Sequence, residues 1–349
     1  AVYVAIGAHQ GKNLGISGED GPGIWTGTEF LNHANSGKKV EVGGKVVVVG
    51  GGDTAIDAAR VSKRVSADAA ALATRMGADV TILYRRTRTE MPAIEREIEE
   101  ALEEGIKIEY LAAPLEVLRD GEGRVRAMVV QRMELGEPDG SGRRRPVPIA
   151  GDTYELPVET VITAVSQQPQ LADLASAELG KGWLNADGWG RTGVDGIWTG
   201  GDNINLGIAT TSIGQARKSA EAIHAFLQGM QPQAQAQGAM IRAEKLKLDW
   251  YQPAERKLRR VKPPEERLAH PFDEVDLGLT LDDALAETAR CFSCGKCFGC
   301  ENCWMYCQNN CFVKIQKPVH GAFYTIKLEV CDGCKKCWEE CPCGFIVGE

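Results

Sequence analysis

The first 290 residues of this 349-residue chain contain no cysteine, and the whole chain has only five histidines. No apolar run approaches the roughly 20 residues that a membrane-spanning helix requires. The patterns H-E-x-x-H, G-x-S-x-G and the Walker sequence do not occur, and no acid–base or nucleophilic side chain stands out as catalytic. The apolar opening AVYVAIGA lacks a basic flank and a cleavage site, so we expect a strand there rather than a signal peptide.

An excess of positive charge is missing as well. The 48 Asp and Glu residues outnumber the 40 Lys and Arg residues, and a net charge of −8 argues against nucleic acid as the main partner. The hydrophobic content of 43% and the charged content of 25% are those of an ordinary soluble globular protein. The chain is long enough for two or three domains, each with its own core.

Cysteine is concentrated near the end of the chain. All 12 cysteines lie between Cys291 and Cys343. A disulfide framework would spread over the fold that it crosslinks and would seldom space cysteines two residues apart. Dense Cys-x-x-Cys runs without a signal sequence predict thiolate ligation of metal in a reducing compartment, which places the protein in the cytoplasm.

The spacing of these cysteines is specific. Residues 331–342 read C-x-x-C-x-x-C-x-x-x-C-P, the run of bacterial two-cluster ferredoxins, and residues 297–308 repeat it with Gln308 in place of the proline. Because the fourth cysteine of each run ligates the other cluster, the sequence predicts two [4Fe–4S] clusters. The predicted ligands are Cys297, Cys300, Cys303 and Cys341 for one cluster, and Cys331, Cys334, Cys337 and Cys307 for the other. A pair of zinc sites is the alternative, although zinc ribbons rarely use tandem runs of this kind.

Four cysteines have no place in these two sets. They are Cys291, Cys294, Cys311 and Cys343. We expect them to be packed small hydrophobes or thiols near a cluster, with a third metal site as the alternative.

A dinucleotide-binding motif lies early in the chain. Lys45–Val49 is the short apolar run of a strand buried on both faces of a parallel sheet, and it leads through a glycine-rich turn into a helical pattern. The turn fits G-x-G-x-x-A in the strand–turn–helix context that this motif requires, with the phosphates bound at the helix N-terminus. The predicted cofactor-binding residues are Gly50, Gly52, Asp53, Thr54 and Ala55.

The next strand, Asp79–Tyr84, indicates which dinucleotide binds. An NAD site usually ends this strand with an acidic residue that binds the ribose 2′-hydroxyl, whereas here Arg85 and Arg86 follow. Guanidinium groups suit bidentate capture of a 2′-phosphate, so NADP(H) is favoured over NAD(H). A solvated basic turn is the alternative. A helix with a solvated glutamate face is then expected over Glu90–Glu104, followed by a β-meander over residues 106–158.

A second set of patterns concerns a flavin. An apolar strand at Thr160–Val165 precedes Gly201-Asp202 and a helix expected to begin near Thr210. The Asp202 carboxylate suits a ribityl hydroxyl, and the helix N-terminus suits negative charge on a reduced isoalloxazine.

These motifs, in this order, resemble the NAD(P)H-dependent flavoproteins related to the glutamate synthase small subunit. The resembling stretches are VAIGA, GEDGPGIWTGTEFL, KVVVVGGGDTAIDAAR, TILYRRTRTEMPA and GGD followed by AT and IGQARKSAEAI, all within residues 1–229. The resemblance implies an NADP site at Gly50, Gly52, Ala55, Arg85 and Arg86. It also implies FAD contacts around Gly7, Gly201, Asp202, Ala209 and Thr210.

The resemblance also implies a domain organisation. A Rossmann-type NAD(P)-binding domain (37–158) is inserted in a partial FAD-binding domain (1–36 and 159–229), giving an α/β fold. A linker (230–288) then leads to an α+β bacterial ferredoxin-like 2[4Fe–4S] domain (289–349). The family's first FAD-binding βαβ unit is absent, so we expect either a fragment or a fold completed by other residues; an intact-mass measurement tests this.

The implied function is electron exchange between NAD(P)H, FAD and two [4Fe–4S] clusters. The C-terminal part resembles the branch that includes the iron–sulfur flavoproteins of dissimilatory sulfur metabolism, which favours a partner redox protein of the sulfite reductase type or a large subunit. The alternative is an electron-transfer or assembly subunit of a 2-oxoacid:ferredoxin oxidoreductase or glutamate-synthase-like complex, without its own NAD(P)H activity.

Three expectations concern the linker. The low-complexity stretch QPQAQAQGA should be flexible, and the basic segment 242–267 should either dock an acidic partner or lie as a solvated strip over the flavoprotein. Thr280 with Asp283 resembles a capping box that starts the helix leading to Cys291.

Overall fold

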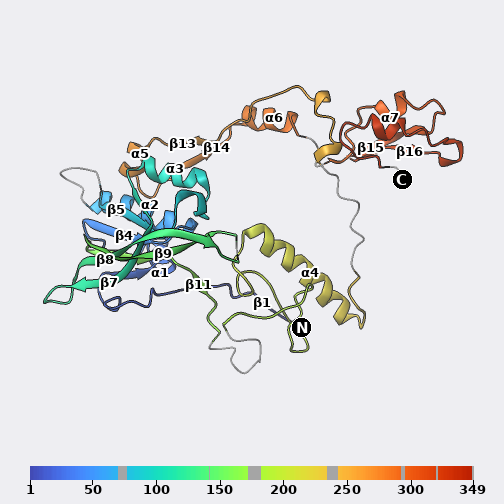
Figure 1. The fold of residues 1–349 in the computed structure, drawn as a ribbon. Helices are drawn as coiled ribbons and strands as arrows, with labels where there is room; N and C mark the ends of the chain where they lie inside the picture. Colours follow the sequence, from blue (N-terminus) through green and yellow to red (C-terminus); the bar gives the residue numbers. More distant parts are fainter. Residues whose placement is uncertain are drawn as a thin grey trace. The chain divides into compact units, whose positions relative to one another are not determined.

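A computed structural model describes residues 1–69, 77–140, 142–171, 182–233, 243–291, 295–319 and 321–347. The chain divides into two compact units. The first comprises Ala1–Gln233 with Lys262–Val275, and the second comprises Ala234–Val261 with Asp276–Glu349. Figure 1 traces the elements of both. Among the described residues, no helix combines the length and the apolar character needed to cross a bilayer.

A parallel five-stranded sheet forms the centre of the first unit. In spatial order its strands are β3 (Ile24–Thr26), β10 (Thr160–Thr163), β4 (Lys45–Val49), β5 (Asp79–Tyr84) and β6 (Lys107–Tyr110). The helices packed with this sheet are α1 (Gly27–Asn35), α2 (Asp53–Ala69) and α3 (Glu95–Glu103).

The alternation of side chains along β4 explains why this strand is apolar throughout. Val46 and Val48 are buried in the core shared with α1, α2 and α3. Val47 and Val49 are buried in a second core on the opposite face, together with residues of an antiparallel three-stranded sheet. The central sheet therefore lies between a helical layer and a β layer. The burial of both faces of β4 confirms what the unbroken valine run predicted.

The β layer is the predicted meander, in part. It consists of β7 (Ala112–Arg119), β8 (Val125–Pro138) and β9 (Arg144–Pro157), paired antiparallel in that order. The prediction was wrong for Lys107–Tyr110, because these residues form β6 and pair in parallel with Thr81–Tyr84 of the central sheet.

The helix predicted over Glu90–Glu104 begins later than expected. A short 3₁₀ turn, η1, covers Arg88–Glu90, Met91 is extended, and α3 starts only at Glu95. Met91 precedes a proline, which disfavours helical backbone at that position. The Tyr84 hydroxyl also donates to the Glu90 carbonyl (2.7 Å), and the Ala93 N–H donates to the Gly51 carbonyl (3.2 Å), so the segment is tied to the glycine-rich loop instead.

The flavin-related segments form a smaller arrangement of strands. β1 (Val2–Val4) pairs in parallel with β12 (Ile197–Thr199), and β2 (Gln10–Gly11) pairs antiparallel with β11 (Gln167–Gln168). Helix α4 (Ala209–Leu227) packs on β12, where the buried Trp198 meets Phe226 edge-on with ring centroids 5.0 Å apart. The helix expected near Thr210 is thus confirmed.

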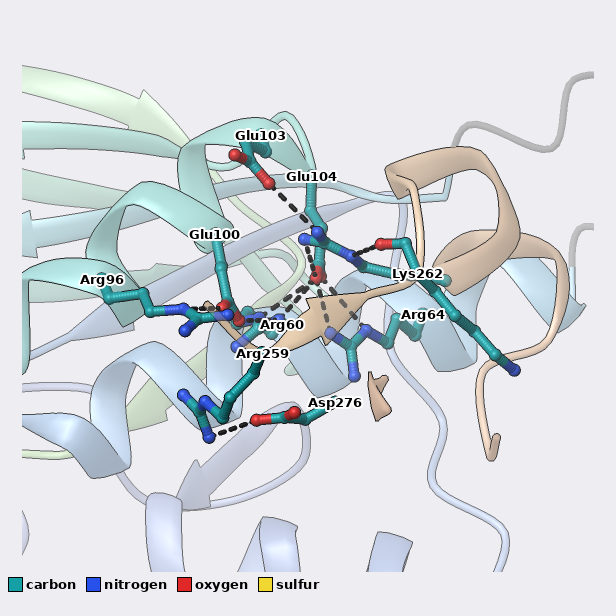
Figure 2. A network of polar contacts seen from close by, with 10 residues as sticks. Arg60, Arg64, Arg96, Glu100, Glu103, Glu104, Arg259, Lys262 and Asp276 are labelled. Carbon is teal, nitrogen blue, oxygen red and sulfur yellow. Dashed lines mark hydrogen bonds and ion pairs between the residues drawn. The ribbon is translucent and has the colours of Figure 1, made fainter. Parts of the chain in front are cut away.

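A network of buried charges joins α2 and α3 to a distant part of the chain. The Glu104 side chain has no exposed surface and accepts hydrogen bonds from Arg60 (2.8 Å), Arg64 (2.5 Å) and Arg267 (3.3 Å). Figure 2 shows Glu104 amid the guanidinium groups, with Glu100 and Glu103 beside it. The prediction that these glutamates only form a solvated face was wrong for Glu104, because three arginines, two from α2 and one from α5, compensate its burial.

Arg267 connects the predicted linker to the end of α3. It lies on α5 (Pro264–Ala269), its side chain is 4% exposed, and it also pairs with Glu103 (3.1 Å). The expectation of a solvated strip over residues 242–267 is therefore wrong at Arg267. The stretch 234–242, which holds most of QPQAQAQGA, lies outside the described residues.

The second unit contains the cysteine-rich region. Its strands are β13 (Arg260–Val261), β14 (Asp276–Gly278), β15 (Phe312–Val319) and β16 (Ala322–Ile326). Its helical elements are η3 (Ala243–Lys245), η4 (Leu248–Trp250), α6 (Leu281–Ala289), α7 (Asn302–Met305), η6 (Leu328–Val330) and α8 (Lys336–Glu339). The predicted cap of α6 is confirmed, because Thr280 Oγ1 accepts from the Asp283 N–H (3.1 Å).

Candidate functional site

The glycines in the loop between β4 and α2 have two different roles. A Cβ on Gly50 would lie 2.4 Å from the Ala164 carbonyl oxygen, and a Cβ on Gly51 would lie 2.4 Å from the Tyr84 ring. A Cβ on Gly52 would meet nothing closer than Pro92, at 4.0 Å. Packing within the protein therefore requires the first two glycines, whereas Gly52 leaves open space that a bound group can approach.

That open space belongs to a cavity of about 580 Å³ at the carboxyl ends of β4, β5 and β10. Thr54, Arg85 and Arg86 line it together with the three glycines. This is the edge at which open parallel sheets bind ligands. Behind the loop, Ala55 is fully buried, as close packing of α2 on the sheet requires.

Asp53 has a structural contact in this loop. Its Oδ1 accepts a hydrogen bond from the Ile94 N–H (3.0 Å) at the start of α3. The carboxylate thus satisfies a backbone donor that the helix leaves unpaired. Its predicted part in cofactor binding stays a prediction.

The two adjacent arginines after β5 have different environments. Arg85 is exposed at the cavity wall, whereas the Arg86 side chain is only 6% exposed. The Arg86 Nη2 pairs with Asp139 Oδ2 (2.8 Å), and its Nε donates to the Arg144 carbonyl (2.7 Å). Both residues line the cavity, and the guanidinium group of Arg86 also binds the hairpin between β8 and β9.

The predicted flavin residues gather at the ends of β1 and β12. Because these strands are parallel, Gly7 and Gly201 follow them at the same edge. Asp202 Oδ1 accepts from the Gly207 N–H (3.1 Å), which shapes the turn before α4. α4 begins at Ala209 and Thr210 without a side-chain cap from Ile208, so its first N–H groups keep their capacity to bind an acceptor.

Sequence reasoning did not single out Asn203, although it directly follows Gly-Gly-Asp. It is fully buried, and its Nδ2 donates to Thr199 Oγ1, which in turn donates to the Val4 carbonyl (2.9 Å). The side chain thereby ties the ends of β1 and β12 together. Its Oδ1 has no hydrogen-bond partner among the described residues.

The cysteines surround two separate cavities in the second unit. One cavity, of about 70 Å³, is lined by the first predicted quartet, Cys297, Cys300, Cys303 and Cys341. The other, of about 310 Å³, is lined by the second quartet, Cys307, Cys331, Cys334 and Cys337. Each cavity thus takes three cysteines from one run and the fourth from the other, the grouping that two cubane clusters require.

The two Cys-x-x-Cys runs share a local backbone. Glu301 and Lys335 each follow a second cysteine and adopt the left-handed conformation, with φ of 70° and 62°. Each is followed by a four-residue helix that carries the third cysteine, α7 or α8. In the described residues no group of His, Cys, Asp or Glu side chains converges closely enough to hold a single metal ion. Each quartet lines a cavity, and the two clusters stay a prediction.

The remaining cysteines divide in the same way. Cys343 lines the first cavity, with its Sγ 3.7 Å from that of Cys341, and Cys311 lines the second, with its N–H donating to Cys307 Sγ (3.3 Å). Cys291 is exposed, and Cys294 lies outside the described residues. Burial among neighbouring thiols raises the pKa of Cys303 to about 12, so a thiolate there requires a compensating cation.

A known protein family matches most of the first unit. Residues 1–229 match the family profile described as pyridine nucleotide-disulphide oxidoreductase. The chain is 33% identical over 333 residues to the NADPH-Fe(3+) oxidoreductase subunit beta of Geobacter sulfurreducens, covering 84% of this chain and 48% of that protein. It is 35% identical to the NADP(+)-dependent formate dehydrogenase subunit beta of Moorella thermoacetica, covering 84% and 42%.

Two further similarities place the fold. The glutamate synthase [NADPH] small chain of Escherichia coli is 31% identical over 65% of this chain and 50% of its own length. The structure of Mycobacterium tuberculosis FprA in complex with NADPH aligns with a TM-score of 0.53 at 20% identity, covering 66% of this chain and 64% of that one. The chain spans about half the length of these curated relatives or less. The predicted α/β Rossmann-type fold is confirmed, while the ferredoxin-like assignment of residues 289–349 stays a prediction.

Proposed function

The chain belongs to the pyridine nucleotide-disulphide oxidoreductase family, and from this we propose that it is an NADP(H)-dependent iron–sulfur flavoprotein oxidoreductase subunit. It exchanges electrons between NADP(H), FAD, two [4Fe–4S] clusters and a partner redox protein. The observation that carries the proposal is the open space at Gly52, which the protein leaves unfilled at the carboxyl edge of a parallel sheet.

The nucleotide site uses the loop and the arginines beside it. Gly50 permits the turn, Gly52 and Thr54 hold the phosphates at the start of α2, and Ala55 allows α2 to pack closely behind the loop. Arg85 takes the 2′-phosphate, with Arg86 beside it. The names of the relatives from Geobacter and Moorella include NADPH and NADP(+), which supports NADP(H) over NAD(H).

The flavin and the clusters have separate sets of residues. Gly7, Gly201, Asp202, Ala209 and Thr210 hold part of FAD at the edge formed by β1, β12 and α4. The two cysteine quartets hold one cluster each. Bound FAD supplies the exchange between hydride and single-electron chemistry, and bound clusters supply a single-electron relay.

The names of the relatives support a partner subunit for this chain. Those from Geobacter, Moorella and E. coli are named as beta subunits or as a small chain, so we propose that this chain also works beside another subunit or redox protein. A partner of the sulfite reductase type is the prediction that the sequence resemblance favours.

Anaerobic spectroscopy of the purified holoprotein tests the proposal. We expect a flavin spectrum over a broad iron–sulfur absorption, bleaching by NADPH, and NADPH-driven reduction of a one-electron dye. A protein with no flavin spectrum and no reaction with NADPH or NADH would contradict it.

The alternative is an electron-transfer or assembly subunit without its own NAD(P)H activity. It predicts that dithionite bleaches the iron–sulfur absorption while NADPH has no effect. The two functions therefore give opposite results in the same cuvette, and co-purification with identification of the bound subunit would name the partner in either case.

A further inference from the structure

The hairpin between β8 and β9 contributes a third arginine to the nucleotide cavity. Pro138 pairs with Arg144 where the hairpin narrows. Beyond this pair, the Asp139 N–H donates to the Arg143 carbonyl (2.7 Å), and the Gly142 N–H donates to the Asp139 carbonyl (2.9 Å). Arg143 lines the same cavity of about 580 Å³ as Gly52 and Arg85, although it lies 58 residues beyond Arg85 in sequence.

The Arg86 side chain binds the hairpin at two points. The Arg86 guanidinium uses Nη2 for the carboxylate of Asp139 (2.8 Å) and Nε for the carbonyl of Arg144 (2.7 Å), and its side chain is 6% exposed. Charge-assisted hydrogen bonds from a buried, planar guanidinium fix both the distance and the orientation of the groups they join. Arg86 therefore ties the end of β5 to the turn that carries Arg143.

The same contacts limit what Arg86 offers to a ligand. Two of its nitrogens are committed to the hairpin, and its charge is compensated by Asp139. Arg85, by contrast, is exposed at the cavity wall, at the position after the second strand where nucleotide-binding sheets contact the ribose 2′ group. A doubly charged phosphate there gains most from a second guanidinium that approaches from another element.

We propose that Arg143 is a specificity-determining residue that binds the 2′-phosphate of NADP(H) together with Arg85. The ion pair between Arg86 and Asp139 positions it. This inference rests on the proposed function, since it names the residues that choose between two nucleotides at the same site. The preference for NADP(H) over NAD(H) would then depend on the hairpin between β8 and β9. This hairpin lies outside the glycine-rich motif and the strand that follows it.

Equilibrium binding of NADP⁺ and NAD⁺ to the purified holoprotein tests the proposal. We expect Arg143→Ala to raise the Kd for NADP⁺ by about 10-fold or more, the effect of losing one charge-assisted contact. The Kd for NAD⁺ should change less than about twofold, because NAD⁺ lacks the 2′-phosphate. Arg143→Lys should recover part of the loss, since it restores the charge but not the planar fork.

A matched control lies two residues away. Arg145 is exposed on the same hairpin but does not line the cavity. Arg145→Ala removes the same charge from the protein, so it should leave the ratio of the two dissociation constants unchanged. Equal losses in the Arg143 and Arg145 variants would show a general electrostatic effect and overturn the proposal.

The positioning role has its own variant. Asp139→Asn keeps the size of the side chain but removes the ion pair with Arg86. We expect it to weaken NADP⁺ binding while sparing NAD⁺, with an unchanged circular dichroism spectrum. If Asp139→Asn weakened the binding of NADP⁺ and NAD⁺ equally, the ion pair would have only a structural role. That result would contradict its proposed role in positioning Arg143.

The outcomes separate this inference from the function on which it rests. A wild-type protein that prefers NADP⁺, with an Arg143→Ala variant that keeps the preference, would overturn the inference and leave the function standing. A wild-type protein that binds neither nucleotide would overturn both.

Discussion

The carboxylate of Glu104 accepts a hydrogen bond from Arg267, a residue 163 positions later in the chain. Glu104 is the C-terminal cap of α3, and Arg267 lies on α5, within the segment that the sequence predicted as a linker. Arg60 and Arg64 of α2 share the same carboxylate (Figure 2). This contact ties α5 to the helices α2 and α3.

Removing the Glu104 carboxylate should be costly, because three largely buried arginines share it as an acidic partner. We expect Glu104→Gln to lower the free energy of unfolding by about 3–5 kcal/mol, measured by urea denaturation. The control is Glu221→Gln, which removes the exposed i,i+4 pair with Arg217 and should cost about 0.5 kcal/mol at most. If both variants lost the same free energy of unfolding, burial would not explain the contribution of Glu104 to stability.

The same carboxylate should make stability depend on pH. Burial tends to raise the pKa of Glu104, but Arg64 and Arg60 together hold it below its ordinary value. A group whose pKa is depressed by folding stabilises the native state fully above its unfolded pKa, near 4.3, and loses that contribution as the pH falls through its folded pKa. We therefore expect stability to decline below about pH 4.3 and the Glu104→Gln variant to show a shallower decline. An identical slope in the two proteins would exclude Glu104 as a source.

Two glycines of the loop between β4 and α2 should respond differently to alanine. Gly52→Ala places a methyl group in the cavity without a clash in the protein. We expect it to abolish most NADP⁺ binding at a stability cost below about 1 kcal/mol. Gly51→Ala overlaps the Tyr84 ring and should cost about 1–3 kcal/mol. Thermal unfolding with nucleotide titration measures both, and retained binding in Gly52→Ala would argue against close approach at this residue.

The fourth cysteine of each run lies with the first three cysteines of the other run, and this grouping predicts which cluster each variant loses. Cys341→Ala should remove the same cluster as Cys300→Ala, and Cys307→Ala the same one as Cys334→Ala, because those residues share a cavity. Iron content and electron paramagnetic resonance distinguish the two clusters. Cys291→Ser, at an exposed cysteine outside both cavities, is the control and should keep all the iron. A Cys307 variant that loses the cluster of Cys300 would reverse the assignment.

Much of the architecture could be predicted from the sequence because its determinants are local. The valine run of β4 has apolar residues on both faces, and the structure buries both faces. The Thr280 cap and the start of α4 are set by a few neighbouring residues. The errors at β6 and α3 have the opposite cause: β6 is defined by its parallel partner β5, and the residues before α3 are held by the glycine-rich loop.

The sequence by itself determined where the cysteines and the glycine-rich turn lie, since spacing over a few residues is a property of the local chain. Only the tertiary structure decided that Arg86 pairs with Asp139 and that Glu104 is buried with three arginines. A charged side chain can leave water only where the fold brings groups of opposite charge to it. Those groups lie on other elements, up to 163 residues away, and no local pattern contains them.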